Sequence, residues 1–354
     1  MPPEQHSMER FGKPSAPLLD ARGHLLTVDG NDALVARTQR IYECYRRQPK
    51  RLVCKVCEHA LEPSPIFVKF DIPYFLCTSC GHFNGGFEDT PEFNAFLYTG
   101  DASAGMTADY REETREAYFR RVEDIYAAKA AFLFDAIASA GENAADLRHA
   151  DLGAGSGYFV AALKAAGVPQ PVGYDVSPDQ IELGNRMLGE PLLRGHGMDE
   201  LYRLAATVEA DVVSLIFTLE HLERPRDLMA ALSANPHVRF VMIAVPTVCP
   251  TMFFELVFPT VFERHLSAHT HVFSDGSLRW LAEHAGFERS AEWWFGSDAM
   301  DVFRDVAIRM GQTGQGDAAQ RMWTDLMRPL IDDWQLAVDR RKLSSAVHLV
   351  LRKT

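Results

Sequence analysis

The chain has 354 residues, of which 47% are apolar and 24% are charged, and its 36 basic and 48 acidic side chains give a net charge of −12. This length predicts a main domain with an accessory one, and the acidity argues against a broad nucleic-acid-binding surface. No apolar run approaches the ~18 residues that span a bilayer, and the first residues lack a basic stretch followed by an apolar core, so we expect a soluble, cytoplasmic protein.

Composition and periodicity divide the chain into four segments. In chain order we expect an N-terminal arm over 1–35, a zinc-ribbon module over 36–97, a helical linker over 98–147 and a main domain over 148–354, with a helical insertion at 298–343.

The accessory module contains four of the six cysteines, arranged as two Cys-x-x-Cys knuckles separated by nineteen residues. Two knuckles at this spacing can place four thiolates around one Zn²⁺, and four thiolates leave no open position for water. The sequence therefore predicts a structural zinc site made by Cys54, Cys57, Cys77 and Cys80. We interpret the remaining Cys44 and Cys249 as small buried apolar residues.

Positive charge concentrates beside the first knuckle, on Arg37, Arg40, Arg46, Arg47, Lys50, Arg51 and Lys55. Three interpretations stay open for this segment: a solvated helix face, a site for a phosphate-bearing substrate such as a nucleotide sugar, and an RNA-binding surface.

The linker has apolar residues at helical spacing between Tyr118 and Ile137, which predicts a helix whose stripe packs in the core. Lys129 interrupts that stripe, and its aliphatic stem can still lie along an apolar surface.

From residue 148 the sequence alternates between strand and helix patterns, which is typical of a parallel α/β sheet. The expected strands cover 150–152, 171–176, 192–193, 211–217, 239–245, 287–295 and 347–351, and the main helices cover 158–166, 178–188 and 277–284.

A glycine-rich turn follows the first of these strands, with glycines at 153, 155 and 157, and Asp175 ends the next strand twenty residues after Gly155. Such a turn lets a ligand approach the backbone, and such an acid binds ribose hydroxyls. A dinucleotide site would need its third glycine at position 158, where this chain has Tyr158. A tight turn without a ligand is the alternative.

The G-x-G-x-G turn resembles motif I of the class I S-adenosylmethionine (SAM) methyltransferases. The sequence LEHLERP at 219–225 resembles the motif that follows the fourth strand in that superfamily. The preceding knuckles resemble a bacterial subgroup that includes deoxysugar C-methyltransferases with an N-terminal zinc module. The resemblance implies an α/β fold with a seven-stranded Rossmann-like sheet, to which the zinc ribbon and the helical insertion are added.

The resemblance also implies roles for individual residues. Asp151, Gly153, Gly155, Gly157 and Phe217 would face the methionyl part of SAM, Asp175 its ribose and Asp199 its adenine. For Asp175 the alternative is a helix N-cap, and for Asp199 it is an acid in the first turn of a helix.

Candidate bases for the acceptor are His221, His269 and His271, because histidine can accept a proton near neutral pH. The resembled subgroup implies His269 in particular, although this chain has Leu266 and Ala268 where those enzymes carry tyrosine and glutamate. His221 can equally be a buried histidine that supports its loop. A metal bound by the cluster of His265, His269 and His271 is not favoured, since no carboxylate has obvious ligand spacing.

Two apolar segments have competing interpretations. For residues 247–262 the interpretations are a lid, a substrate wall, or a helix packed in the core or at a homodimer interface. The aromatic residues 293–295 are interpreted as core rather than as a sugar-stacking platform.

The leading hypothesis is a SAM-dependent methyltransferase that modifies an oxygen or carbon of a small-molecule or carbohydrate acceptor. The alternatives are a zinc-ribbon RNA methyltransferase and a non-catalytic binding module with a SAM fold.

Overall fold

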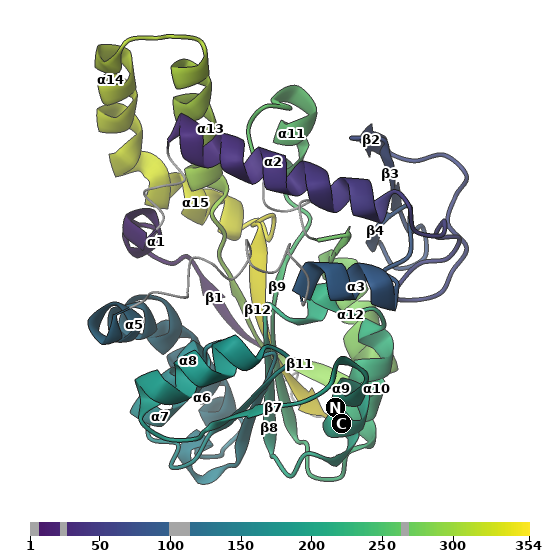
Figure 1. Ribbon diagram of the computed structural model, residues 1–354. Helices are drawn as coiled ribbons and strands as arrows, with labels where there is room; N and C mark the ends of the chain where they lie inside the picture. The colour runs from purple at the N-terminus through teal and green to yellow at the C-terminus, as the bar shows by residue number, and fades with distance from the viewer. Residues whose placement is uncertain (1–6, 22–26, 99–113, 263–268) are drawn as a thin grey trace.

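A mixed eight-stranded sheet forms the centre of the computed structural model, which describes residues 7–21, 27–98, 114–262 and 269–354 (Figure 1). The strand order is β1-β11-β12-β9-β8-β5-β6-β7. The strands are β1 (Met8–Phe11), β5 (His149–Leu152), β6 (Val172–Asp175), β7 (Leu193–Gly195), β8 (Val212–Ile216), β9 (Phe240–Pro246), β11 (Phe287–Trp294) and β12 (Ala346–Lys353). Strands β5 to β9 are parallel, and β12 is antiparallel to both of its neighbours.

Strand β9 shows why the sheet is covered on both faces. Its residues are all buried, and they alternate between two apolar cores: Val241, Ile243 and Val245 enter one, whereas Phe240, Met242 and Ala244 enter the other. A continuous apolar run is what a strand needs when helices cover both faces.

The helices divide between the two faces as the alternation predicted. One face is covered by α5 (Arg115–Arg121), the π-helix η3 (Val122–Tyr126), α6 (Ala127–Ser139), α7 (Tyr158–Ala165) and α8 (Pro178–Leu188). The other is covered by α9 (Leu201–Thr207), α10 (Pro225–Ala234) and α12 (Asp275–His284). Short 3-10 turns occur at η4 (Ala144–Asp146), η5 (Met198–Glu200) and η6 (Leu219–His221).

The sheet has one strand more than the expected seven. Residues Met8–Phe11, which we had assigned to an N-terminal arm, pair in parallel with β11 and form an edge strand. The helix α1 (Ala16–Ala21) follows, and α2 (Val28–Tyr45) runs across the expected boundary at residue 35. The N-terminal segment is therefore built into the main fold.

The zinc-ribbon module forms a second, antiparallel sheet with the strand order β10-β4-β3-β2. Strands β2 (Phe67–Lys69), β3 (Ile72–Leu76) and β4 (Phe83–Gly85) come from the module, and α3 (Pro91–Tyr98) follows them. The fourth strand, β10 (His271–Val272), comes from the main domain and pairs with β4. Because the two modules share this sheet, they are joined by backbone hydrogen bonds as well as by side-chain packing.

The expected insertion consists of α13 (Asp298–Gln312), α14 (Asp317–Met327), η8 (Arg328–Leu330) and α15 (Ile331–Asp339) (Figure 1). The apolar segment 247–262 contains η7 (Pro250–Phe253) and α11 (Phe254–Val257). Met252, Val261 and Phe262 are buried, whereas Val257 is exposed, so both ends of that segment pack inside the protein and its middle faces solvent. In the described part of the chain, every helix is too short or too polar to cross a membrane.

Candidate functional site

The glycine turn lies at the carboxyl end of β5, where it folds back onto β6. The backbone N–H groups of Gly153 and Ala154 both donate to the carbonyl of Tyr174, at 2.8 and 3.0 Å. Gly153 has a φ of +76°, and a Cβ there would lie 2.4–3.0 Å from the side chain of Thr218. Both the backbone conformation and the close approach of Thr218, two residues after β8, therefore require glycine at this position.

Asp175 lies at the end of β6 and faces the same turn. One carboxylate oxygen accepts from the backbone N–H of Gly155 at 2.7 Å, and the other accepts from that of Ser177 at 2.9 Å. The alternative of a helix N-cap is not realised, because the N-cap residue of α8 is Ser177. Each oxygen keeps a second lone pair, so the carboxylate can still accept hydrogen bonds from two ribose hydroxyls.

Asp151 lies below the turn and is 2% exposed. Its carboxylate accepts from the hydroxyl of Ser214 at 2.5 Å. Burial, opposed by the Ser214 hydrogen bond and assisted by the negative charge of Asp175, raises the pKa of Asp151 to about 7. This buried side chain therefore links β5 to β8 through Ser214.

Phe217 occupies a strained position at the carboxyl end of β8. Its φ is +55°, in the left-handed region that a bulky residue rarely adopts, and its side chain is partly exposed. The amino group of Lys129 lies 4.9 Å from the ring centroid, and the ring of His348 makes an edge contact at 5.8 Å. Strain of this kind is concentrated at functional sites.

The linker helix contributes side chains that sequence reasoning had assigned only to packing. Tyr118 donates its hydroxyl hydrogen to the carbonyl of Ser156 in the glycine turn at 2.8 Å, and its ring stacks on Tyr158. Lys129 is 3% exposed, and its ammonium lies 4.5 Å from the ring centroid of Tyr126. Tyr126 lies in the π-helix η3, and such turns frequently occur at functional sites. This feature is visible only in the three-dimensional structure.

Asp199 lies on the surface in η5, the third element after the strand β6 that ends in Asp175. It stands in the first turn of that short helix, as its alternative interpretation described. Its role in holding adenine stays a prediction.

The histidines separate into two groups. His221 in η6 and His269 before β10 come together, with ring centroids 4.9 Å apart. Glu220 lies beside them, and the ligand atoms of the three residues all fall within 4.8 Å of one another. Burial raises the pKa of Glu220 to about 8 and, together with the charge of Lys55, lowers that of His221 to about 4.

His271 lies apart from this trio in the second sheet. It is 1% exposed, and its Nδ1 is 2.9 Å from Nε2 of His82 in the zinc-ribbon module. Its burial argues against contact with an acceptor, so we do not retain it as a base. His265 falls outside the described residues.

We had disfavoured a metal at the histidines because no carboxylate stands at ligand spacing in the sequence, and that argument was misleading. Glu220 stands in the LEHLERP phrase, and the fold brings it to His269 from the loop after β8. The sequence did contain a signal for Glu220: an acid directly before a histidine, in a loop after a parallel strand. Parallel sheets bind ligands at the carboxyl ends of their strands.

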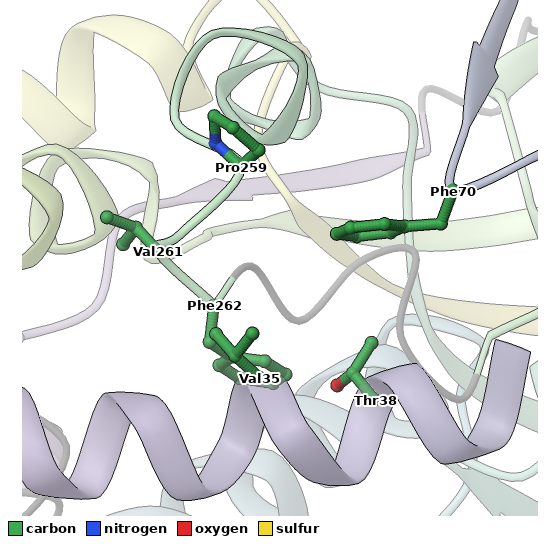
Figure 2. A pocket seen from close by; sticks show the side chains of 6 residues that line it. All are labelled: Val35, Thr38, Phe70, Pro259, Val261 and Phe262. Atoms are coloured by element: carbon green, nitrogen blue, oxygen red, sulfur yellow. The ribbon is translucent and has the colours of Figure 1, made fainter.

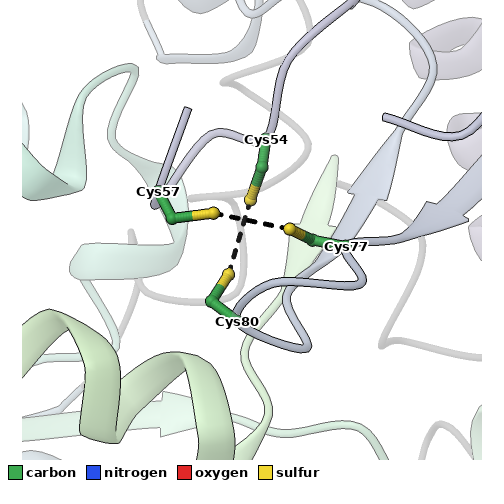
Figure 3. A group of neighbouring side chains, drawn as sticks. All are labelled: Cys54, Cys57, Cys77 and Cys80. Carbon is green, nitrogen blue, oxygen red and sulfur yellow. Dashed lines mark hydrogen bonds between the residues drawn. The ribbon is translucent and has the colours of Figure 1, made fainter. Parts of the chain in front are cut away.

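The four predicted zinc ligands converge, with their sulfur atoms pointing at a common centre (Figure 3). The Sγ atoms of Cys54 and Cys80 are 3.6 Å apart, and those of Cys57 and Cys77 are 3.4 Å apart. A tetrahedral Zn²⁺ with Zn–S bonds of about 2.3 Å places its sulfurs about 3.8 Å apart, so the donor set fits zinc.

The two knuckles have the same backbone hydrogen bonds. Cys54 donates to the carbonyl of His59 and accepts from Glu58, just as Cys77 donates to His82 and accepts from Gly81. The equivalent residues Glu58 and Gly81 both have positive φ. Each knuckle is thus a preformed turn that presents two thiols on one side.

The basic segment does not form one continuous surface. Arg51 and Lys55 are buried, and both pair with the buried carboxylate of Asp89. Arg46 pairs with Asp71 at 2.8 Å. Arg51 and Lys55 are therefore used inside the protein, which weakens the interpretation of this segment as a phosphate or RNA site.

Two cavities lie away from the glycine turn. One, of about 10 Å³, is lined by Val35, Thr38, Phe70, Pro259, Val261 and Phe262 (Figure 2). The other, of about 390 Å³, lies at the start of β11, at the opposite end of the sheet. The first has room for about one water. The glycine turn and Asp175 therefore remain the candidate nucleoside site on the strength of their backbone and carboxylate groups alone.

The sequence profile of a family described as "Methyltransferase domain" matches residues 118–291, just under half of the chain. No curated protein matches the chain.

Solved structures with a similar fold include three methyltransferases. Magnesium protoporphyrin IX methyltransferase from Synechocystis PCC 6803 is 12% identical, with a TM-score of 0.43 over 74% of this chain and 97% of that one. Geranyl diphosphate C-methyltransferase from Streptomyces coelicolor A3(2) is 13% identical, with a TM-score of 0.42 over 69% and 85%. A SAM-dependent methyltransferase from Archaeoglobus fulgidus is 15% identical, with a TM-score of 0.40 over 70% and 99%.

Proposed function

We propose that this chain, which carries a SAM-dependent methyltransferase domain over residues 118–291, transfers a methyl group to an oxygen or carbon of a small-molecule acceptor. One observation carries the proposal. The glycine turn after β5, Asp175 after β6, Phe217 after β8 and the His221–His269 pair all follow carboxyl ends of neighbouring strands or the loops beyond them. Parallel sheets bind their ligands at this edge.

The residues around the turn match the parts of SAM. The backbone of residues 153–157 would lie against the methionyl part, Asp175 would accept from both ribose hydroxyls, and Asp199 would lie near adenine. SAM brings an activated methyl group on a positively charged sulfur. This chain's residues then have to orient the acceptor, and orientation alone can lower a barrier by on the order of 7–11 kcal/mol.

The acceptor side is formed by His221 and His269. A histidine base remains the prediction for an acceptor that must lose a proton, and these two imidazoles are its candidates. No contact of the described residues favours a carbohydrate over another small molecule.

We also propose that Cys54, Cys57, Cys77 and Cys80 hold a structural Zn²⁺. All four thiolates would be used as ligands, so the ion would have no position for a substrate. Its role is to hold the two knuckles together and thereby to keep β4 in register with β10.

Isothermal titration with SAM tests the cofactor assignment. Asp175→Ala should weaken binding at least tenfold, whereas Glu182→Ala, an exposed acid on α8, should leave it unchanged. Because Asp175 also holds two backbone N–H groups, thermal melting should accompany each titration. Asp175→Asn, which keeps one acceptor oxygen, is the second variant if the alanine protein does not fold. Equal affinity in folded variants and wild type contradicts the proposal.

RNA as the acceptor is the second candidate. It is disfavoured by the acidic composition and by the internal pairing of Arg51 and Lys55. RNA binding that falls steeply with salt would reverse this preference.

A further inference from the structure

We infer that Glu220, His221 and His269 bind a divalent metal ion at the acceptor side of the site. The three side chains come from two loops that are distant in sequence, η6 after β8 and the segment before β10. The inference rests on the proposed function for its role in catalysis, but the binding itself can be measured without any methyl transfer.

The spacing of the donor atoms is close to that of a bound ion. Nε2 of His221 lies 4.0 Å from Oε1 of Glu220, and no two ligand atoms of the trio are more than 4.8 Å apart. With bonds of about 2.1 Å, two ligands of one ion lie about 3.0–3.4 Å apart at adjacent octahedral or at tetrahedral positions. The donors therefore need to draw together by roughly 1–2 Å.

The burial of Glu220 supplies an independent observation. The residue is 1% exposed, and neither carboxylate oxygen has a hydrogen-bond partner among the described residues. The buried Nδ1 of His221 likewise has none there. A buried polar group that is not paired costs free energy. A divalent cation would displace the carboxyl proton on binding and give these acceptor atoms a partner.

The charges around the trio allow a cation. Two positive groups act on the trio. Lys55 acts on His221 and already pairs with Asp89, and Lys129 acts on Glu220, whose negative charge it favours. Tyr98, at the end of α3, places its ring edge-on to His221 with centroids 5.7 Å apart, so an aromatic ring packs against one of the proposed ligands.

Two imidazoles and one carboxylate favour a first-row divalent ion such as Mn²⁺, Fe²⁺ or Zn²⁺. Three protein ligands leave open positions, in contrast to the closed four-thiolate site. An acceptor hydroxyl bound there has a lowered pKa and loses its proton to water. The oxygen then attacks the methyl carbon, the C–S bond breaks, and its electron pair stays on sulfur. The site thus selects an oxygen acceptor.

Mn²⁺ is a suitable probe, because its preference for oxygen and nitrogen ligands keeps it from competing for the thiolates. Electron paramagnetic resonance of free Mn²⁺ should show one ion bound per full-length, zinc-loaded chain. His269→Ala and Glu220→Gln should each weaken that binding at least tenfold. His237→Ala, which removes an exposed histidine outside the trio, should not.

SAM titration on the same samples separates the two proposals. A protein that binds Mn²⁺ through the trio but does not bind SAM overturns the methyltransferase assignment and supports the metal site. Two results would overturn the metal site in a protein that binds SAM. One is equal Mn²⁺ affinity in wild type, His269→Ala and Glu220→Gln; the other is no binding at millimolar Mn²⁺. The imidazoles then keep the role of proton acceptor. Thermal melting confirms that each variant is folded, and the isosteric Glu220→Gln is the less disruptive of the two.

Discussion

His82 of the zinc-ribbon module and His271 of the main domain share a buried hydrogen bond, with Nε2 and Nδ1 2.9 Å apart. The other nitrogen of His82, Nδ1, lies 3.3 Å from the hydroxyl of Ser277, which donates to the carbonyl of Ser274. The network therefore assigns the proton on Nδ1 to each imidazole, so that His271 donates to His82. This bond connects the zinc ribbon to the strand that follows His269.

Removing either imidazole should destabilise the protein. His82→Leu or His271→Leu leaves one buried ring nitrogen without its partner, at a cost of about 1–3 kcal/mol. The double variant should lose less than the sum of the two single variants. Unfolding by urea, analysed as a double-mutant cycle, measures the coupling. Additive losses would mean that the two rings do not interact.

Loss of one zinc ligand should affect the whole chain. Cys54, Cys77 and Cys80 pack in the same apolar core as Phe273 and Leu278 of the main domain. Binding of a structural zinc ion contributes on the order of 10 kcal/mol to folding. Cys54→Ser should therefore abolish the one equivalent of zinc and lower the thermal midpoint of unfolding.

Metal analysis after dialysis and thermal melting check this prediction, with Cys44→Ser as the matched control. Cys44 is a cysteine outside the cluster, so its variant should keep its zinc. A full equivalent of zinc in Cys54→Ser would contradict the assignment of the ligands.

Phe217 should be more important for SAM than for folding. Glycine at this position relieves the positive φ, by on the order of 1 kcal/mol, and removes a ring that is 38% exposed. The two effects oppose each other, so Phe217→Gly should change the free energy of unfolding by no more than about 1 kcal/mol. SAM affinity should fall at least fivefold, as measured by isothermal titration. An unchanged affinity would place the ring outside the cofactor site.

Asp151 should make the protein less stable as pH rises. Its pKa is about 7 in the folded protein because of burial, but about 4 in the unfolded chain. The folded state therefore holds this proton longer, and the contribution of Asp151 to stability is lost as pH rises from about 4 through 7. The groups that act on it are Ser214, Asp175 and Lys129.

Asp151→Asn removes this dependence and keeps an acceptor for the Ser214 hydroxyl. We expect the variant to be about 1–3 kcal/mol more stable than wild type at pH 8, with a smaller difference at pH 5. Urea unfolding at the two pH values measures the change. A difference that is independent of pH would show that Asp151 does not titrate in this range.

The chain's own periodicity was sufficient to predict most of the sheet. The strands expected over 171–176, 211–217 and 239–245 lie within one or two residues of β6, β8 and β9. The signals are strong because a strand buried on both faces must be apolar throughout. Strand β1 was missed, since four residues at an edge have no such requirement.

The sequence by itself determined the glycine turn, the position of Asp175 at the end of the next strand and the cysteine knuckles, because each depends on local backbone geometry or on spacing along the chain. Only the tertiary structure decided which histidines meet. His221, His269 and His271 were all candidate bases by sequence, but β10 directs His271 to His82 and leaves His269 beside His221 and Glu220. Contacts between residues this far apart depend on how whole strands pair, and local sequence patterns carry no information about that pairing.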